Sequence, residues 1–170
     1  MIKIVESTFE AIKADEKVLD YVRYVFKRAH NYEKWYFPMA FNKCPFFLLY
    51  SDQKLIGFTC VGDHSPSKHF KNEALSNIPY LFNFSIDPLY RKKIYSFNNK
   101  QQKPSYILMD FIVDKYPAIN LDVIESNTFA YEFFKKFNFK ETDEFIPPFA
   151  NQNSKRVFKS MIRIDIANDA

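Results

Sequence analysis

The chain has 170 residues, of which 47% are hydrophobic and 26% charged, and its formal net charge is +4. This composition excludes a disordered or fibrous chain and predicts one globular domain over residues 1–170. No apolar stretch approaches the roughly 18 residues of a membrane-spanning helix, and acidic residues interrupt the first segment before a secretory signal can form. We therefore expect a cytoplasmic protein that does not act on membranes.

The positive net charge is too small to indicate a nucleic-acid-binding protein. The clustering of Lys92, Lys93, Lys100 and Lys103 in one region suggests a local anion site instead. Cys44 and Cys60 lie far apart in the sequence, which argues against a disulfide framework and predicts two buried, reduced thiols. His64 and His69 lack acidic or cysteine partners at metal-ligand spacing, so no metal site is expected. Because the chain has only two glycines, tight glycine turns cannot be its means of holding a ligand.

Hydrophobic periodicity predicts a regular alternation of elements in the first half of the chain. Apolar residues recur at helical spacing over 18–29, and two β-prone apolar runs are separated by four polar residues, which is typical of a hairpin. The expected elements are a strand at 3–5, a helix capped by Ser7 or Thr8, a helix at 18–29, and a hairpin of strands at 45–50 and 55–61. A long loop over 63–79 follows.

In the second half, strands alternate with helices. The expected elements are a strand at 80–87, a polar basic loop at 91–103, a helix at 105–116 that Pro104 opens, a strand at 119–124, a phenylalanine-rich helix capped by Ser126 or Asn127, and strands at 139–149 and 156–166. We expect the helical spacing of Phe129, Phe133, Phe134 and Phe137 to serve core packing. The element order predicts a mixed α+β domain with a ligand crevice at the carboxyl ends of central strands.

The segment most informative about chemistry is residues 80–96, in which a strand ends at Asp87-Pro88 and runs directly into three basic residues, Arg91, Lys92 and Lys93. Backbone N–H groups in a loop before a helix form a positive concavity, and basic side chains strengthen it for a pyrophosphate. A phosphate site is one interpretation. A solvated basic turn is the other.

Residues 119–139 extend this pattern. Together the two segments resemble the GNAT superfamily of N-acetyltransferases, and the resemblance covers about residues 45–146. The matching positions are Asp87-Pro88, Arg91, Leu121-Asp122-Val123, Asn127, Ala130 and Phe139. The resemblance implies a GNAT-like fold, a central mixed, mostly antiparallel sheet of six to seven strands flanked by helices.

The resemblance also implies acetyl-CoA as cosubstrate, with no metal. The backbone of one strand would pair with the pantetheine arm, the following turn would wrap the pyrophosphate, and an asparagine would position the thioester. The implied coenzyme-binding residues are Phe84, Ser85, Ile86, Arg91, Lys92, Lys93, Ile94, Tyr95, Ser96, Asn127 and Phe134.

The sequence departs from the family pattern at several positions. The loop glycines of the family fall on Ile94 and Ser96, and about seven extra residues, 97–103, precede the helix. The family's tyrosine falls on Phe134, which has no proton to give, so Tyr131, one turn earlier, is the candidate acid. Tyr80 and Asn83 occupy the positions of the family's acidic base and are the remaining catalytic candidates.

These residues predict an enzyme that transfers the acetyl group of acetyl-CoA to a primary amine of a small molecule or protein by direct attack. The alternative is a GNAT-fold protein that binds acyl-CoA or a partner without turnover. A homodimer is compatible with the sequence.

Overall fold

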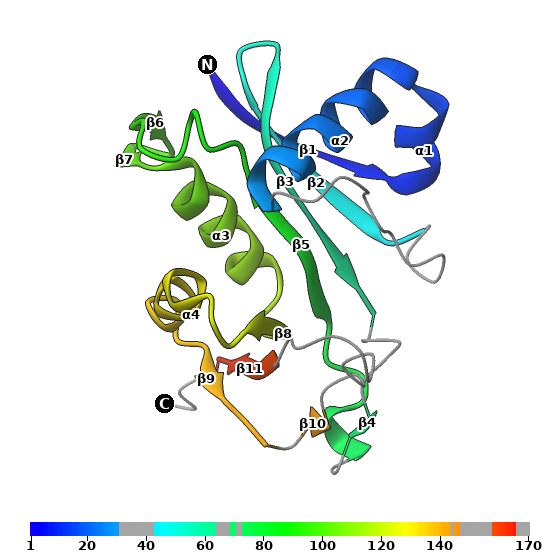
Figure 1. The fold of residues 1–170 in the computed structure, drawn as a ribbon, viewed down its shortest axis with the longest axis vertical. Helices are drawn as coiled ribbons and strands as arrows, with labels where there is room; N and C mark the ends of the chain where they lie inside the picture. The colour runs from blue at the N-terminus through cyan, green and yellow to red at the C-terminus, as the bar shows by residue number, and fades with distance from the viewer. Residues whose placement is uncertain (31–42, 64–68, 71–72, 144, 147–157, 166–170) are drawn as a thin grey trace. The chain divides into compact units, whose positions relative to one another are not determined.

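The computed structural model describes residues 1–30, 43–63, 69–70, 73–143, 145–146 and 158–165 (Figure 1). Helices and strands are mixed along the chain. The elements are β1 (Ile2–Thr8), α1 (Phe9–Ala14), α2 (Glu16–His30), β2 (Pro45–Ser51), β3 (Lys54–Gly62), β4 (His69–Phe70), the short 3-10 helix η2 (Glu73–Leu75), β5 (Tyr80–Ile86), β6 (Tyr95–Phe97), β7 (Lys100–Gln102), α3 (Pro104–Lys115), β8 (Ala118–Ile124), α4 (Thr128–Lys135), β9 (Lys140–Glu141), β10 (Phe145–Ile146) and β11 (Phe158–Ile164).

The main sheet has seven strands in the order β1-β2-β3-β5-β8-β11-β9. Antiparallel pairing joins β1 to β2, β2 to β3, β8 to β11 and β11 to β9, whereas β5 pairs with β8 in parallel. The short strands β4 and β10 form a separate antiparallel pair. The mixed α+β class with a mostly antiparallel sheet is thereby confirmed.

The chain packs as two compact units. The first unit contains residues 1–62 and 81–112, and the second contains residues 63–80 and 113–170. Strand β5 begins in the second unit, where Tyr80 pairs with Asn120 of β8, and continues in the first.

The two N-terminal helices of the first unit follow the predicted pattern. The Thr8 hydroxyl accepts a hydrogen bond from the Ala11 amide at 3.2 Å, which identifies Thr8 as the helix cap. The apolar stripe of α2 is buried as expected, at Val22, Val25 and Phe26. Burial of one stripe is what holds such a helix to the domain, because propensity alone leaves a 15-residue helix marginal.

The core of the first unit is aromatic. Phe46, Phe47 and Phe58 are fully buried on β2 and β3, and the Phe47 ring lies 5.4 Å from that of Phe111 on α3. Cys44 and Cys60 are also buried and form no disulfide, as predicted. With so few glycines and so many large rings, packing of this sheet depends on side-chain volume.

The second unit is organised around polar side chains at the start of β5 and on β8. The Tyr80 hydroxyl donates to Asp122 Oδ2 at 3.2 Å, and the Ser160 hydroxyl donates to Asp122 Oδ1 at 2.7 Å. The buried Asn120 amide donates to the carbonyl oxygens of Ile78 and Pro79 at 3.1 and 2.9 Å. These bonds satisfy polar groups that would otherwise be costly to bury.

The basic segment 91–103, expected to be a loop, contains a hairpin instead. Strands β6 and β7 pair antiparallel, with Tyr95 opposite Gln102 and Phe97 opposite Lys100. The two turn residues, Asn98 and Asn99, have φ angles of 49° and 61°. Two consecutive left-handed residues match the twist of a two-residue hairpin, which the apolar pattern could not reveal.

Two further expectations need correction. The single strand expected at 139–149 is divided into β9 and β10, and residues 147–157 lie outside the described part of the chain. On α4, Phe134 is buried as expected, but Phe129 in the first helical turn is 90% exposed. Helical spacing therefore located the helix and misjudged only the burial of its first phenylalanine.

Left-handed backbone positions are taken by asparagine and aspartate. The described residues with positive φ are Asp52, Asn83, Asn98, Asn99 and Asn138. These side chains tolerate the left-handed region because they can hydrogen-bond locally to the backbone. The chain thus makes turns that other proteins assign to glycine.

Gly57 on β3 allows residues 85 and 86 of β5 to approach the β3 backbone closely. A Cβ atom there would lie 2.9 Å from the Ser85 carbonyl oxygen and 2.6 Å from Ile86 Cδ1. Because the first contact is to backbone, we expect Gly57→Ala to lower the free energy of unfolding by about 1–3 kcal/mol through overpacking. Urea unfolding measures this change, with Lys100→Ala at an exposed position as control. Equal midpoints for the two variants would contradict the close approach.

Candidate functional site

Strand β5 is distorted at its centre. Asn83 has a φ of 53°, and its side-chain Nδ2 is buried without a hydrogen-bond partner among the described residues. A left-handed residue inside a strand, combined with an unsatisfied buried donor, is costly and is more common at functional sites than elsewhere. Asn83 is one of the catalytic candidates named from the sequence.

His30, at the end of α2, contacts the same strand. Its Nε2 lies 2.7 Å from the Ser85 hydroxyl, and that hydroxyl donates to the Asn83 carbonyl oxygen at 3.2 Å. Because the Ser85 hydroxyl proton is donated to Asn83, the Ser85 oxygen acts as acceptor toward His30. His30 Nε2 can therefore form this hydrogen bond when it carries the ring proton. Burial, and then the charge of Arg91, lowers the pKa of His30 to about 4, so the ring is neutral at physiological pH.

An ion pair ties α2 to the end of β5. Asp87 is fully buried, and its Oδ1 accepts from Arg28 Nε at 3.1 Å and from the Leu89 amide at 3.0 Å. The carboxylate raises the pKa of Arg28, mainly through this hydrogen bond. The Asp87 amide also donates to the Ile56 carbonyl oxygen at 2.8 Å. Backbone hydrogen bonding to β3 therefore continues one residue past the end of β5.

Arg91 has a structural task. Its Nε donates to the Ile86 carbonyl oxygen at 3.1 Å, and its Nη2 donates to the Ala29 carbonyl oxygen at 3.0 Å. Desolvation lowers its pKa. The Ala29 carbonyl belongs to the last turn of α2, where carbonyl groups lack helical partners, so Arg91 serves as a cap for that helix.

The turn after β5 leaves several amides available. The amides of Tyr90 and Lys93 donate to the carbonyl oxygens of Asp87 and Tyr90 at 2.9 and 3.0 Å. Within the described residues, the amides of Arg91, Lys92 and Ile94 have no acceptor. Free N–H groups beside basic side chains are the features that an anion site requires.

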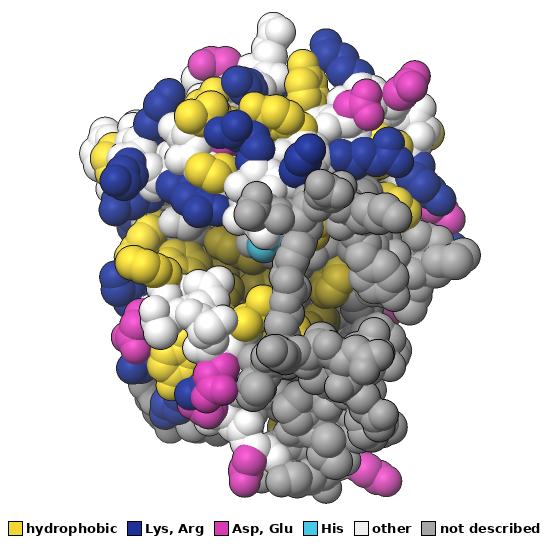
Figure 2. Space-filling view, viewed as in Figure 1, with side chains coloured by type: hydrophobic (Ala, Val, Ile, Leu, Met, Phe, Trp, Pro, Cys, Tyr) yellow, Lys and Arg dark blue, Asp and Glu magenta, His cyan; other side chains and the backbone are white. Residues whose placement is uncertain are grey.

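The other predicted loop residues face different surroundings. Lys92 is exposed, Ile94 is 54% exposed, and Tyr95 and Ser96 begin strand β6. The Lys93 ammonium lies 4.5 Å from the centre of the Tyr90 ring. Figure 2 shows several Lys and Arg side chains close together on one part of the surface.

The remaining predicted residues lie in the second unit and are engaged there. Burial raises the pKa of Tyr80 well above its ordinary value, and its hydroxyl is bound to Asp122. The Tyr131 hydroxyl donates to Glu141 at 3.1 Å, and Asn127 caps α4 by accepting from the Ala130 amide at 3.1 Å. Phe134 packs against Phe139 with ring centres 5.7 Å apart.

The structure thus brings together, within the first unit, the half-buried Phe84, the buried Ser85 and Ile86, and the residues 91–96. The sequence pattern did not indicate that His30 or Arg28 belongs to this arrangement. Both follow the apolar stripe of α2 at its C-terminal end, where histidine and arginine are favoured. That placement was the one available signal.

Other site types are not represented in what the structure describes. No group of three or more His, Cys, Asp or Glu side chains among these residues could hold a metal ion. None of the described helices combines the length and apolarity needed to cross a membrane. His64 lies outside the described residues, as does the side chain of His69.

No model of a known protein family matches the sequence, and a search of curated proteins returns no relative. Solved structures are nevertheless similar over almost the whole chain. The ribosomal-protein-S18-alanine N-acetyltransferase of Escherichia coli has a TM-score of 0.63 at 17% identity, covering 99% of this chain and 97% of its own. Two Arabidopsis thaliana structures are also similar.

The first is Naa50 with the bisubstrate analogue CoA-Ac-MVNAL, at a TM-score of 0.63 and 16% identity, covering 95% of this chain and 97% of its own. The second is NAA60 with acetyl-CoA, at a TM-score of 0.60 and 10% identity, covering 95% of this chain and 97% of its own.

Substitution of Arg28 and of Asp87, singly and together, tests the ion pair that joins α2 to the end of β5. Arg28→Met leaves a buried carboxylate without its cation, whereas Asp87→Asn removes the buried charge itself. We therefore expect Arg28→Met to lower the free energy of unfolding more than Asp87→Asn does. The double variant should be at least as stable as Arg28→Met in urea titrations. Strictly additive losses would show that the two side chains do not interact.

The buried, neutral state of His30 predicts a pH-dependent stability. The unfolded chain binds a proton near pH 6.5 and the folded chain only near pH 4, so stability is lost as the pH falls through this window. Between pH 7 and 5 the histidine should contribute a loss of about 2 kcal/mol. His30→Gln should remove this part of the pH dependence in urea unfolding. An unchanged profile would contradict the lowered pKa.

Strand order, helix placement and the three structural likenesses agree with the fold expected from residues 45–146. The chain has the fold of the GNAT N-acetyltransferases.

Proposed function

We propose that this protein is an acetyl-CoA-dependent N-acetyltransferase that acts on a primary amine. The observation that carries the proposal is the turn after β5, where the amides of Arg91, Lys92 and Ile94 have no acceptor among the described residues and the sequence has three consecutive basic residues. A coenzyme A pyrophosphate needs such donors. The unsatisfied Nδ2 of Asn83 supports an acyl arm on the same strand, because a ligand carbonyl would accept its hydrogen bond.

The reaction joins the amine nitrogen to the acetyl carbon and breaks the carbon–sulfur bond, while the amine loses a proton and the sulfur gains one. The role proposed for this chain is mainly positioning. Phe84, Ser85 and Ile86 would hold the pantetheine arm by backbone pairing, and residues 91–96 would hold the pyrophosphate. Orientation of this kind contributes several kcal/mol to such transfers.

The described candidates offer little acid–base assistance at neutral pH. Tyr80 and Tyr131 have their hydroxyl groups bound to carboxylates, Asn83 does not titrate, and His30 has a pKa of about 4. An acceptor that arrives as a free amine is therefore favoured. At pH 7.5 about a third of peptide α-amines are neutral, against roughly one in a thousand lysine side chains.

This argument favours a peptide α-amine as acceptor. The named substrate of the Escherichia coli enzyme, an alanine of ribosomal protein S18, and the peptide part of the analogue bound to Naa50 support the same class. A comparison of peptides with a free α-amine against peptides acetylated at that position, with lysine present in both, tests the preference by release of the coenzyme A thiol.

The same lack of free acid and base groups supports the second candidate, a GNAT-fold protein that binds acyl-CoA or a partner without turnover. Retention of acetyl-CoA by the purified protein, with no thiol release across the peptide panel, would favour this alternative. Multiple turnovers with any α-amine peptide would exclude it.

Lys92 provides a clean test of the pyrophosphate site because its exposed side chain makes no ion pair within the described residues. We expect Lys92→Glu to weaken coenzyme A binding at least about tenfold through repulsion, and to change pantetheine binding less than about twofold. Calorimetric titration of both ligands measures this, with Lys100→Glu in strand β7 as control. Equal losses for the two ligands would contradict the assigned position of the pyrophosphate.

A further inference from the structure

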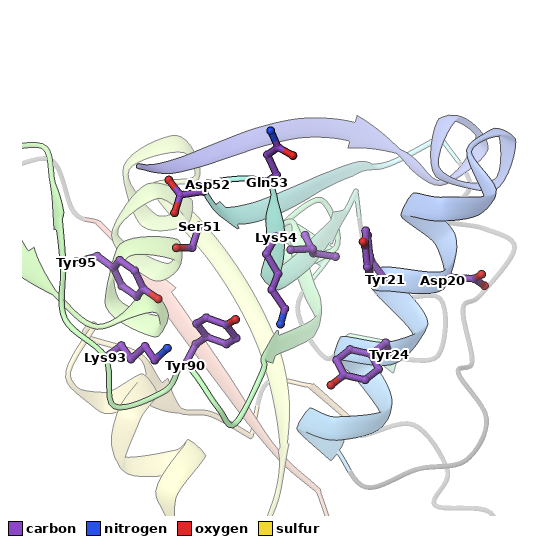
Figure 3. Close-up of a pocket in the computed structure, with 11 residues that line it drawn as sticks. Asp20, Tyr21, Tyr24, Ser51, Asp52, Gln53, Lys54, Tyr90, Lys93 and Tyr95 are labelled. Carbon is purple, nitrogen blue, oxygen red and sulfur yellow. The ribbon is translucent and has the colours of Figure 1, made fainter.

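A separate pocket of about 900 Å³ lies in the first unit (Figure 3). Three segments line it: one face of α2, the turn between β2 and β3, and the stretch that follows β5. Its lining residues are Asp20, Tyr21, Tyr24, Ser51, Asp52, Gln53, Lys54, Leu55, Tyr90, Lys93 and Tyr95. We call it the tyrosine–lysine pocket. Its volume is in the range of small-molecule sites.

The pocket presents ammonium groups without carboxylate partners. Lys54 and Lys93 both lie near the Tyr90 ring, at 5.4 and 4.5 Å from its centre, and neither forms an ion pair with any described carboxylate. In Figure 3 the Lys54 side chain points into the space between Tyr90 and Tyr24. Two cations that line one pocket without carboxylate partners give it a positive potential, which favours an anion.

The two acidic side chains of the lining do not cancel this charge. Asp20 pairs with Arg23 at 3.7 Å, and Asp52 contacts the amino group of Met1. Figure 3 shows both carboxylates directed away from the Lys54 amino group. A cationic ligand, such as an amine acceptor, is disfavoured because the lysines already occupy the Tyr90 ring.

The aromatic part of the lining supplies stacking surfaces. Tyr21 and Tyr95 form no ring or cation contact with any described residue, so their faces remain available. Tyr21 is 38% exposed, whereas the Tyr24 ring already has the Arg28 guanidinium 5.4 Å from its centre. A nucleotide base can stack on such a tyrosine ring, as bases of single-stranded nucleic acids stack on aromatic side chains.

We propose that the tyrosine–lysine pocket binds a mononucleotide, with the phosphate held by Lys54 and the base stacked on Tyr21. Lys93 and Tyr95 of the lining also belong to residues 91–96, which the proposed function assigns to the coenzyme. The mononucleotide is distinguished from the acyl-CoA by Lys54 and Tyr21, which belong to none of the segments assigned to the coenzyme. A nucleotide in this pocket would contact α2 and the turn after β5 at once, the two segments that the Arg28–Asp87 and Arg91–Ala29 bonds connect.

The probe is AMP, compared with adenosine and with inorganic phosphate, by calorimetric titration in the absence and presence of saturating coenzyme A. AMP should bind at least about tenfold more tightly than either fragment, because both the charge and the ring contribute. Its affinity should persist when coenzyme A is bound. Displacement of AMP by coenzyme A would overturn the proposal, since the pocket would then belong to the coenzyme. Equal affinities for AMP and adenosine would also overturn it.

Variants separate this site from the coenzyme site. Lys54→Gln and Tyr21→Leu should each weaken AMP binding at least about fivefold and leave coenzyme A binding within about twofold. Lys100→Gln, an exposed lysine outside the pocket, is the matched control. If both pocket variants bind AMP as the unaltered protein does, the proposal is wrong. A protein that binds AMP but no coenzyme A would refute the proposed function and leave this inference standing.

Discussion

The fully buried carboxylate of Asp87 is the constraint on which the arrangement of the first unit depends. A buried charge is tolerable only when it is paired and hydrogen-bonded, and Asp87 obtains both from Arg28 on α2 and from the amide of Leu89. The last turn of α2 is therefore fixed against the end of β5. Arg91 adds a second link by binding the carbonyl oxygens of Ile86 and Ala29.

With α2 fixed in this way, the position of His30 follows. His30 lies two residues beyond Arg28 and contacts the Ser85 hydroxyl. Its ring is largely buried and lies near the positive charge of Arg91. A second cation at this point would be unfavourable, so the ring is held neutral. Arg91, which the sequence resemblance assigns to the pyrophosphate, here binds carbonyl oxygens of the protein itself. The proposed anion site would therefore rely on the exposed Lys92 and on the amides of the turn.

Periodicity predicted the elements that bury one face. It located α2 through Val22, Val25 and Phe26 and identified the hairpin of β2 and β3, because burial repeats at a fixed spacing in those segments. It missed β6 and β7, where backbone pairing and two left-handed asparagines form the strands without an apolar stripe. His30 was missed for another reason: its partner, Ser85, is 55 residues away, and no local pattern encodes such a contact.

The use of asparagine and aspartate at left-handed positions also affects the chain before it folds. Glycine explores more backbone conformations than any other residue, so each glycine replaced by a side-chain-bearing residue narrows the unfolded ensemble. Asp52, Asn83, Asn98, Asn99 and Asn138 place this restriction at a hairpin tip, inside a strand, in a second hairpin and after a helix. The unfolded chain therefore has fewer conformations at these positions than it would have with glycine. Less conformational entropy is lost there when the chain folds.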